Sequence, residues 1–116
     1  MKFKLIIALV GVEQTETTLD CARAGGATGS TVIGSARGEG LTPAKTFLGL
    51  DIEDSRDMVL FLVEAHLSRG ILETLAETCK FDESPGSGIA FQIDIEDAVG
   101  LASQIGKISS EIEDQI

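Results

Sequence analysis

The sequence predicts an α+β domain in which an antiparallel sheet carries two helices on one face. Three observations lead to this prediction. Apolar segments of strand length alternate with helical patterns in the order strand, helix, strand, and this order occurs twice. The 116 residues, 43% of them hydrophobic, are enough for one domain with a buried core and too few for two. In each half, glycines at 25–29 and 86–88 mark the turn between the helix and the next strand.

The first half of the pattern begins with a continuous apolar strand over residues 5–10. Residues 15–24 predict a helix, because Thr15, Leu19 and Ala22 share one face and a glycine pair follows as a stop signal. The β-branched residues of 31–35 predict the second strand. A loop then runs over 37–46 and contains a proline.

The second half repeats the arrangement after a short extended segment over 47–50 and an acidic turn over 51–55. Residues 58–63 predict a strand that is apolar on both faces. Residues 66–79 predict a helix whose apolar side chains recur every four residues. A final strand with one face in the core follows from strict alternation, in which Ala90, Gln92 and Asp94 separate Ile89, Phe91, Ile93 and Ile95. The element order is that of the ferredoxin-like, split βαβ fold.

The predicted first and third strands have no polar residues at their centres. Helices on one side can cover only one face of such a sheet, so the other face needs a second cover. We therefore expect copies of this chain to associate through that face, closed by rotational symmetry.

Beyond the sheet domain of residues 1–97, the tail over 98–116 predicts an amphipathic helix. Its apolar residues recur at spacings of four and three, namely Leu101, Ile105, Ile108, Ile112 and Ile116. The tail would pack on its own domain or on a neighbouring subunit, and a frayed end is the alternative.

Charge and composition exclude several function classes. Nine Lys and Arg against 19 Asp and Glu leave a net charge of −10, which argues against a nucleic-acid or anionic membrane surface. The apolar run near the N-terminus is short and lacks a small-residue cleavage site, so we read it as a strand and expect a cytoplasmic protein. Cys21 and Cys79 are expected to be free thiols.

No enzyme class is indicated, because no nucleophile stands beside a recognisable base. The acidic residues Asp51, Glu53, Asp54 and Asp57 lack the spacing of a calcium loop and predict a solvated turn. His66 is the only histidine and is expected to cap a helix or lie on the surface.

Two glycine-containing loops offer backbone amides and small hydroxyls to an anion, Gly29-Ser30-Thr31 and Gly86-Ser87-Gly88. They would form one site if they met at one edge of the sheet or across a subunit interface, with Arg37 and Lys45 as the nearest cations. Ordinary turns are the alternative. The segment with Leu41, Thr42, Pro43 and Lys45 is a candidate partner-binding loop, and a plain connection is its alternative.

Three segments of the chain resemble the P-II nitrogen-regulatory signalling proteins: 27–32, 36–40 and 86–95. The resemblance spans roughly residues 3–97. It implies a homotrimer whose sheets pack together at the centre and whose intersubunit clefts bind adenine nucleotides. By this resemblance, the residues along the nucleotide would be Gly29, Ser30 and Thr31. Gly38 and Gly40 would lie at the base of the regulatory loop. The phosphate-holding loop would contain Gly86, Ser87 and Gly88.

The chain departs from that family where phosphate is held. Ser87 replaces the family's aspartate, Ile89 stands at the position of its lysine, and residues 96–101 lack its basic side chains. Each lost charge-assisted contact is worth about 1.5–3 kcal/mol. The expected effector is therefore AMP, ADP or ATP, with fewer phosphates favoured, and neither magnesium nor 2-oxoglutarate carries over. The regulatory loop is shorter and has no tyrosine, which removes uridylylation.

The resulting expectation is a trimeric regulator of nitrogen metabolism or transport. Its 37–46 loop would be ordered by the effector, with Arg37 close to the ligand, and would bind a target enzyme or a membrane transporter. A metal-tolerance trimer of the same fold is one alternative, although a single histidine and scattered cysteines argue against it. A ligand-free assembly module is the other.

Overall fold

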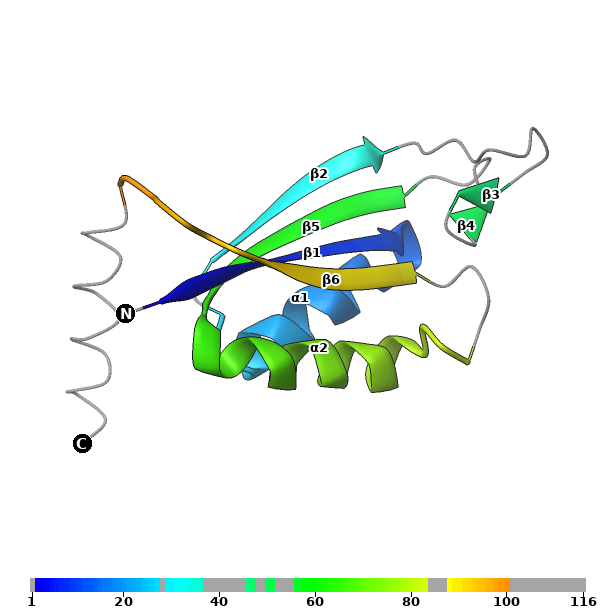
Figure 1. Ribbon diagram of the computed structural model, residues 1–116. Helices are drawn as coiled ribbons and strands as arrows, with labels where there is room; N and C mark the ends of the chain where they lie inside the picture. The colour runs from blue at the N-terminus through cyan, green and yellow to red at the C-terminus, as the bar shows by residue number, and fades with distance from the viewer. Residues whose placement is uncertain are drawn as a thin grey trace.

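The computed structural model of the chain describes residues 2–27, 29–36, 46–47, 50–51, 56–83 and 88–100. Its main sheet is antiparallel, with strand order β2-β5-β1-β6, and consists of β1 (Phe3–Gly11), β2 (Ser30–Ala36), β5 (Arg56–Glu64) and β6 (Gly88–Asp94). Helices α1 (Thr15–Ala24) and α2 (Ala65–Cys79) lie side by side against one face of this sheet (Figure 1). The predicted ferredoxin-like α+β fold is confirmed.

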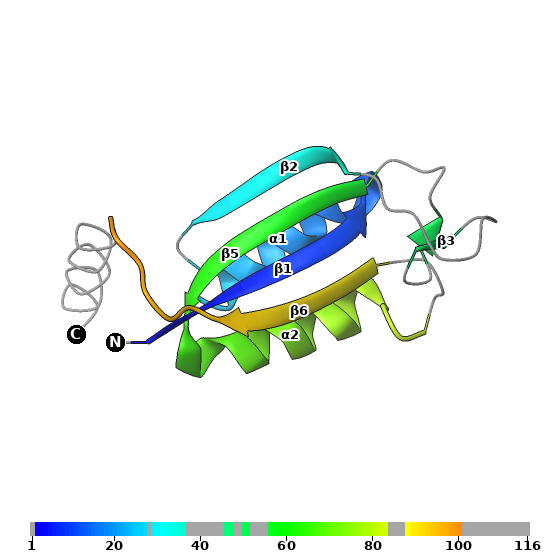
Figure 2. The ribbon, with the colours of Figure 1, turned by 45° about the horizontal axis from the view of Figure 1, so that its top comes forward.

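Each helix connects two strands that have a third strand between them, so both βαβ units are split (Figure 2). The helix over 15–24 has the predicted bounds, and the other helix begins one residue before its predicted start. A short 3-10 turn (Val12–Gln14) joins β1 to α1. Instead of one extended segment over 47–50, the structure has two short antiparallel strands, β3 (Thr46–Phe47) and β4 (Leu50–Asp51).

The hydrophobic core lies between the helices and one face of the sheet. Alternate residues of the two central strands are at most 1% exposed: Ile6, Ala8 and Val10 from β1, and Val59, Phe61 and Val63 from β5. Opposite them, α1 contributes Ala22, and α2 contributes Ile71 and Leu75. Burying a side chain as large as Phe61 stabilises the fold by about 1.5–3 kcal/mol.

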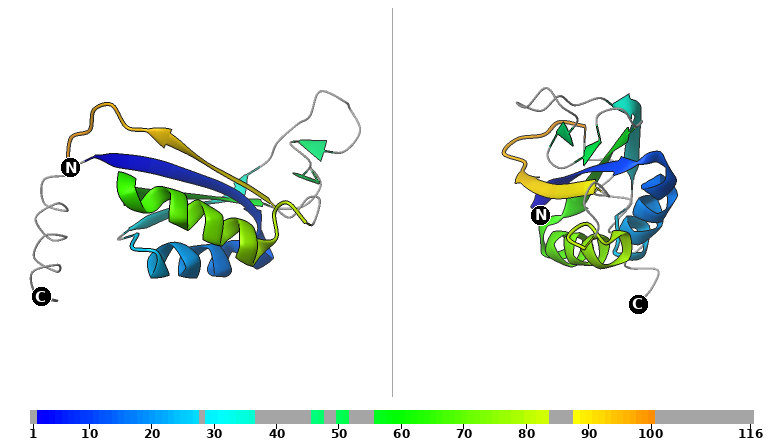
Figure 3. Two further views of the ribbon diagram at one scale, coloured as in Figure 1. Left: turned by 60° about the horizontal axis from the view of Figure 1, so that its bottom comes forward. Right: turned by 90° about the vertical axis from the view of Figure 1, so that its right-hand side faces the viewer.

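The other face of the sheet is also apolar, and no helix among the described residues covers it (Figure 3). The strand register aligns three rows of side chains there: Leu5, Ile7 and Leu9; Leu62, Leu60 and Met58; and Ile93, Phe91 and Ile89. We call these nine residues the open face. Phe91 is 38% exposed and Ile93 47% exposed. The two-faced apolar character predicted for the central strands is thus present in the structure.

In the last strand, β6, the more apolar face points away from the core, whereas the sequence pattern led us to expect it in the core. Phe91 pairs with Ile7, and Gln92 with Ile6, so the isoleucines and Phe91 of β6 belong to the open face. The core side of β6 carries Ala90 and Gln92 instead. Alternation indicated two faces, but only the register with β1 determines which face meets the helices.

Gly25 ends α1 beside Ile71 of α2. The Gly25 amide donates to the Cys21 carbonyl at 3.0 Å, and Gly26 has a φ of 106°. A Cβ on Gly25 would lie 2.6 Å from Cγ1 of the buried Ile71. The predicted glycine stop therefore also permits the contact between the two helices.

Cys79 closes α2 inside the core. The side chain is 1% exposed, and its Sγ lies 3.8 Å from Oγ1 of Thr18 in α1. Burial raises the pKa of the Cys79 thiol, and the hydrogen bond with Thr18 offsets part of that effect. Both cysteines are free thiols, as predicted.

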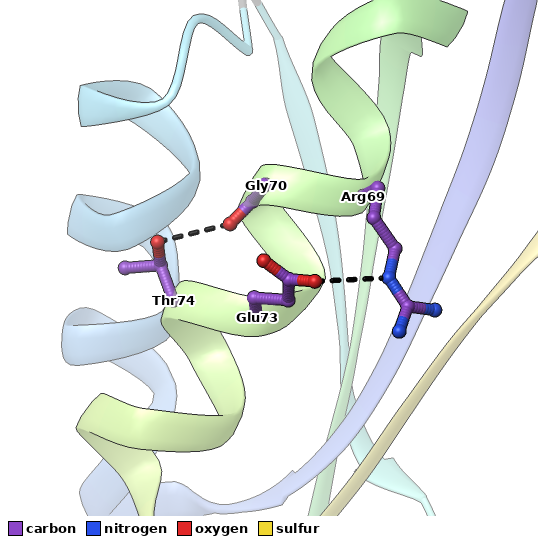
Figure 4. Close-up of polar contacts among 4 residues, drawn as sticks. All are labelled: Arg69, Gly70, Glu73 and Thr74. Carbon is purple, nitrogen blue, oxygen red and sulfur yellow. Dashed lines mark hydrogen bonds and ion pairs between the residues drawn. The ribbon is translucent and has the colours of Figure 1, made fainter.

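Gly70 is an exposed glycine in the middle of α2, next to the Arg69–Glu73 ion pair (Figure 4). A Cβ there would meet no atom within 4 Å. Gly70→Ala should therefore raise the free energy of unfolding by about 1 kcal/mol, because alanine has the higher helix propensity. Gly25→Ala is the matched comparison. It should lower the free energy of unfolding by about 1–3 kcal/mol through overpacking against Ile71. Urea unfolding measures both, and equal effects would contradict the packing described.

Because the folded state raises the pKa of Cys79, this thiol keeps its proton at a pH where the unfolded chain releases it. The associated stability is fully present below the unfolded thiol pKa of about 8.5 and is lost as the pH rises through the folded value. Unfolding free energies measured from pH 7 to pH 10 should fall less steeply for Cys79→Ala than for the wild type. An unchanged slope for Cys79→Ala would show that this thiol does not contribute.

Candidate functional site

We call one end of the main sheet the loop end. The strand residues at this end are Gly11 of β1, Ala36 of β2, Arg56 of β5 and Gly88 of β6. Gly11 and Ala36 both pair with Arg56, while Gly88 pairs with the neighbouring Val10. Here β1 and β2 end, and β5 and β6 begin. The segments 37–45, 52–55 and 84–87 therefore all join the sheet at the loop end.

Arg56 is the buried cation of the loop end. It is only 8% exposed, and its buried Nε has no hydrogen-bond acceptor among the described residues. Within the same part of the chain, Arg56 forms no ion pair. Strand alternation places it on the same side of the sheet as the open face. A buried donor such as this Nε is costly when it has no acceptor, and an anion is a ligand that would suit the guanidinium.

Gly11 leaves room for this guanidinium. A Cβ at that position would lie 2.8 Å from Nη1 of Arg56 and would also collide with the Glu13 carboxylate. Arg56 was not among the site residues predicted from the sequence. Its only sequence signal is an arginine at the start of an apolar strand, directly after an acidic turn.

Asp57, the next residue of β5, lies on the opposite side of the sheet and is tied to the helix layer. Its Oδ2 accepts a hydrogen bond from Oγ1 of the buried Thr15 at 2.6 Å. Across from Asp57, β2 contains a β-bulge, because Ile33 pairs with Met58 and Ala36 pairs with Arg56. Two residues of β2 therefore face one residue of β5. Bulges of this kind are common beside binding sites.

Gly88 is the one described member of the predicted phosphate-holding loop. Its φ is 153°, and a Cβ would lie 2.8 Å from the Leu9 carbonyl oxygen and 2.7 Å from Cε1 of Phe81. Glycine at this position thus allows a close backbone approach. Several predicted site residues lie outside the described residues: Arg37, Gly38, Gly40, Leu41, Thr42, Pro43, Lys45, Gly86 and Ser87.

Gly29, Ser30 and Thr31 are exposed at the start of β2, away from the loop end. Strands β2 and β6 are opposite edges of the sheet, separated by roughly 14 Å at the usual strand spacing. Gly29 and Gly88 therefore do not meet at one edge of a single sheet. A Cβ on Gly29 would have no neighbour within 4 Å, so packing inside the described chain does not require glycine there.

A cavity of about 210 Å³ lies between α1 and the start of β2. Its lining residues are Leu19, Ala22, Arg23, Ala27, Gly29, Ser30 and Phe61. Arg23 at this cavity is paired with Asp20 at 3.1 Å, and both side chains are largely exposed. Sites for drug-sized ligands usually measure about 300–1,000 Å³. The cavity is therefore too small to hold a nucleotide without further walls.

The described residues contain no cluster of three or more His, Cys, Asp or Glu side chains that could hold a metal ion. His66 is a surface residue at the start of α2, and its Nε2 lies 3.4 Å from Glu64. Its predicted surface position is confirmed. None of the helices within the described ranges is long and apolar enough to cross a membrane.

The fold is similar to that of solved PII-like proteins. CPII from Thiomonas intermedia K12, bound to ADP, AMP and acetate, matches with a TM-score of 0.65 and 24% identity, over 84% of this chain and 89% of that chain. The apo form of CPII matches with a TM-score of 0.65 and 21% identity, over 82% and 90%. A PII-like signalling protein from Thermus thermophilus matches with a TM-score of 0.61 and 21% identity, over 82% of this chain and 88% of that chain.

None of the curated proteins matches the sequence. The family model of nitrogen regulatory protein P-II does match, over residues 3–104, which is most of the chain and includes the whole main sheet and both helices. The resemblance noted for residues 3–97 is thereby confirmed. With its split βαβ topology and its loop end as described, this chain belongs to the P-II family.

Proposed function

We propose that this protein is a P-II-like regulator that binds an adenine nucleotide in clefts between the subunits of a homotrimer. The observation that carries the proposal is Arg56, a buried guanidinium at the loop end whose Nε has no acceptor in the described ranges. Family membership supports a signalling role. CPII was crystallised with ADP and AMP, which supports an adenine nucleotide as the ligand.

The open face supports the trimer. Its nine apolar side chains form one continuous surface over three strands, and leaving such a surface in water is unfavourable. Three copies related by a threefold axis would bury these surfaces together. The separation of Gly29 from the loop end supports a cleft between subunits, because one ligand could then contact Gly29 of one subunit and Arg56 of the next.

Charges near the loop end support a ligand with few phosphates. Arg56 starts β5 there and Arg37 directly follows β2, while β6 carries Ile89 instead of the family's lysine. We infer that AMP or ADP binds more tightly than ATP, because each further phosphate would lack its own cation.

Control of a partner would pass through the 37–46 segment, which leaves the sheet beside Arg56 at Ala36. Ligand bound at its base would change how Leu41, Thr42, Pro43 and Lys45 are presented to a target enzyme or membrane transporter. This makes the protein a regulator rather than an enzyme, acting in the cytoplasm on nitrogen metabolism or transport.

Light scattering tests the assembly. The wild type should have the mass of a trimer, and Phe91→Lys should dissociate it because the substitution adds charge to the open face. Val99→Lys is the control, since Val99 is 99% exposed and lies outside the open face. A monomeric wild type would contradict the proposed clefts.

Calorimetry with AMP, ADP and ATP tests the ligand. Arg56→Gln should weaken binding about tenfold or more, the equivalent of losing a hydrogen bond between charged groups, worth about 1.5–3 kcal/mol. Arg37→Ala should also weaken it. Arg69→Gln is the matched control, because Arg69 is exposed on α2 and pairs with Glu73.

Arg56→Gln should fold at least as stably as the wild type, since it removes a buried charge that has no partner among the described residues. Wild-type affinities weaker than about millimolar for all three nucleotides would overturn the proposed ligand. Tight binding that is unchanged in Arg56→Gln would remove Arg56 from the site.

A further inference from the structure

We propose that Asp57, held by Thr15, is a positioning residue that sets the geometry of the nucleotide site at the loop end. This inference rests on the function proposed above. Asp57 lies on the helix side of the sheet and therefore does not touch a ligand bound beside Arg56. It acts through two neighbours, the bulge of β2 and Arg56 itself.

The Asp57 carboxylate lies between the start of α1 and the bulge of β2. Oδ2 accepts the 2.6 Å hydrogen bond from Thr15, the first residue of α1. Oδ1 faces Gly34, where it lies 3.7 Å from the position that a Cβ would take. One side chain thus holds the start of α1 and lies beside the irregular part of β2. A short hydrogen bond to a charged oxygen is among the stronger ties that a half-buried group can make.

The bulge determines how β2 enters the 37–46 segment. Without the extra residue, Ser35 would stand beside Arg56, but in the structure Ala36 occupies that place. Each residue along a strand alternates sides, so the insertion reverses the side to which the following residue belongs. Ser35 has a φ of 58°, a conformation that is unfavourable for serine and needs support from its surroundings. Asp57 is the β5 residue opposite this strained position.

The position of the Arg56 side chain depends on the same hydrogen bond between Thr15 and Asp57. Arg56 and Asp57 are the first two residues of β5, and their side chains lie on opposite faces of the strand. A shift or twist of this strand start would move both side chains together. Fixing Asp57 to α1 therefore also fixes the guanidinium over Gly11. Residues that orient a binding group in this way commonly affect affinity strongly without contacting the ligand.

Thr18 provides a matched control, one turn further along α1. Its Oγ1 donates to the Gln14 carbonyl at 2.8 Å and contacts Cys79, and it is fully buried. Thr18→Val and Thr15→Val each remove one buried hydroxyl from the same helix without changing its shape. Only Thr15→Val breaks a contact that leads to the loop end.

The experiment combines calorimetry with ADP and hydrogen exchange of the full chain without ligand. Thr15→Val should weaken ADP binding by about tenfold, whereas Thr18→Val should leave it within about twofold. Thr15→Ser should restore binding because it retains the hydroxyl. Amide exchange over residues 33–36 and 56–58 should accelerate in Thr15→Val and not in Thr18→Val.

Equal losses of ADP affinity in the two valine variants would overturn the positioning role, since a general loss of stability would then explain both. Unchanged exchange at 33–36 and 56–58 in Thr15→Val would overturn it independently of any nucleotide. If the wild type fails to bind ADP, the proposed function falls, and the exchange data alone then decide whether Thr15 and Asp57 hold the loop end.

Discussion

The structure depends on a sheet that is apolar on both faces and has described helices on only one. The hydrophobic effect requires both faces to leave water, but α1 and α2 cover only the side that carries Ile6, Phe61 and their neighbours. On the other side, the nine apolar residues of the open face are neighbours across three strands and not scattered surface hydrophobics. The proposed assembly would bury the open face by the same hydrophobic effect that folds the domain, and the proposed ligand site would lie between its subunits.

The loop end shows how polar groups are arranged around this apolar framework. Arg56 and Asp57 are neighbours in β5 but lie on opposite sides of the sheet. Among the described residues, the Arg56 Nε has no acceptor, whereas Asp57 is bound to Thr15. The cation is suited to an external anion, and the paired carboxylate is suited to holding the strand in place. A single alternation step thus separates the proposed binding residue, Arg56, from the proposed supporting residue, Asp57.

The chain has the fold of its family. Ile89 in β6 is part of the open face. The family resemblance implies a lysine at this position, so in the proposed trimer Ile89 would add apolar area to the interface and remove a charge from the proposed phosphate site. Arg56 and Gly88 both lie at the loop end, on either side of β1, so the proposed site would keep a cation and a close backbone approach.

Local patterns in the sequence were enough to predict both helices, the four strands of the main sheet and the family. The helix over 15–24 was predicted with its bounds, because the glycines that follow it end a helix whatever its surroundings. The strands were predicted from apolar runs, a pattern that can be recognised without knowing which distant residues pair with them. Only the tertiary structure decided which face of β6 meets the helices, where β2 bulges, and that Arg56 is buried with no described acceptor for its Nε. These features depend on strand register and on contacts between residues far apart in the chain, such as Thr15 with Asp57, which no local pattern encodes.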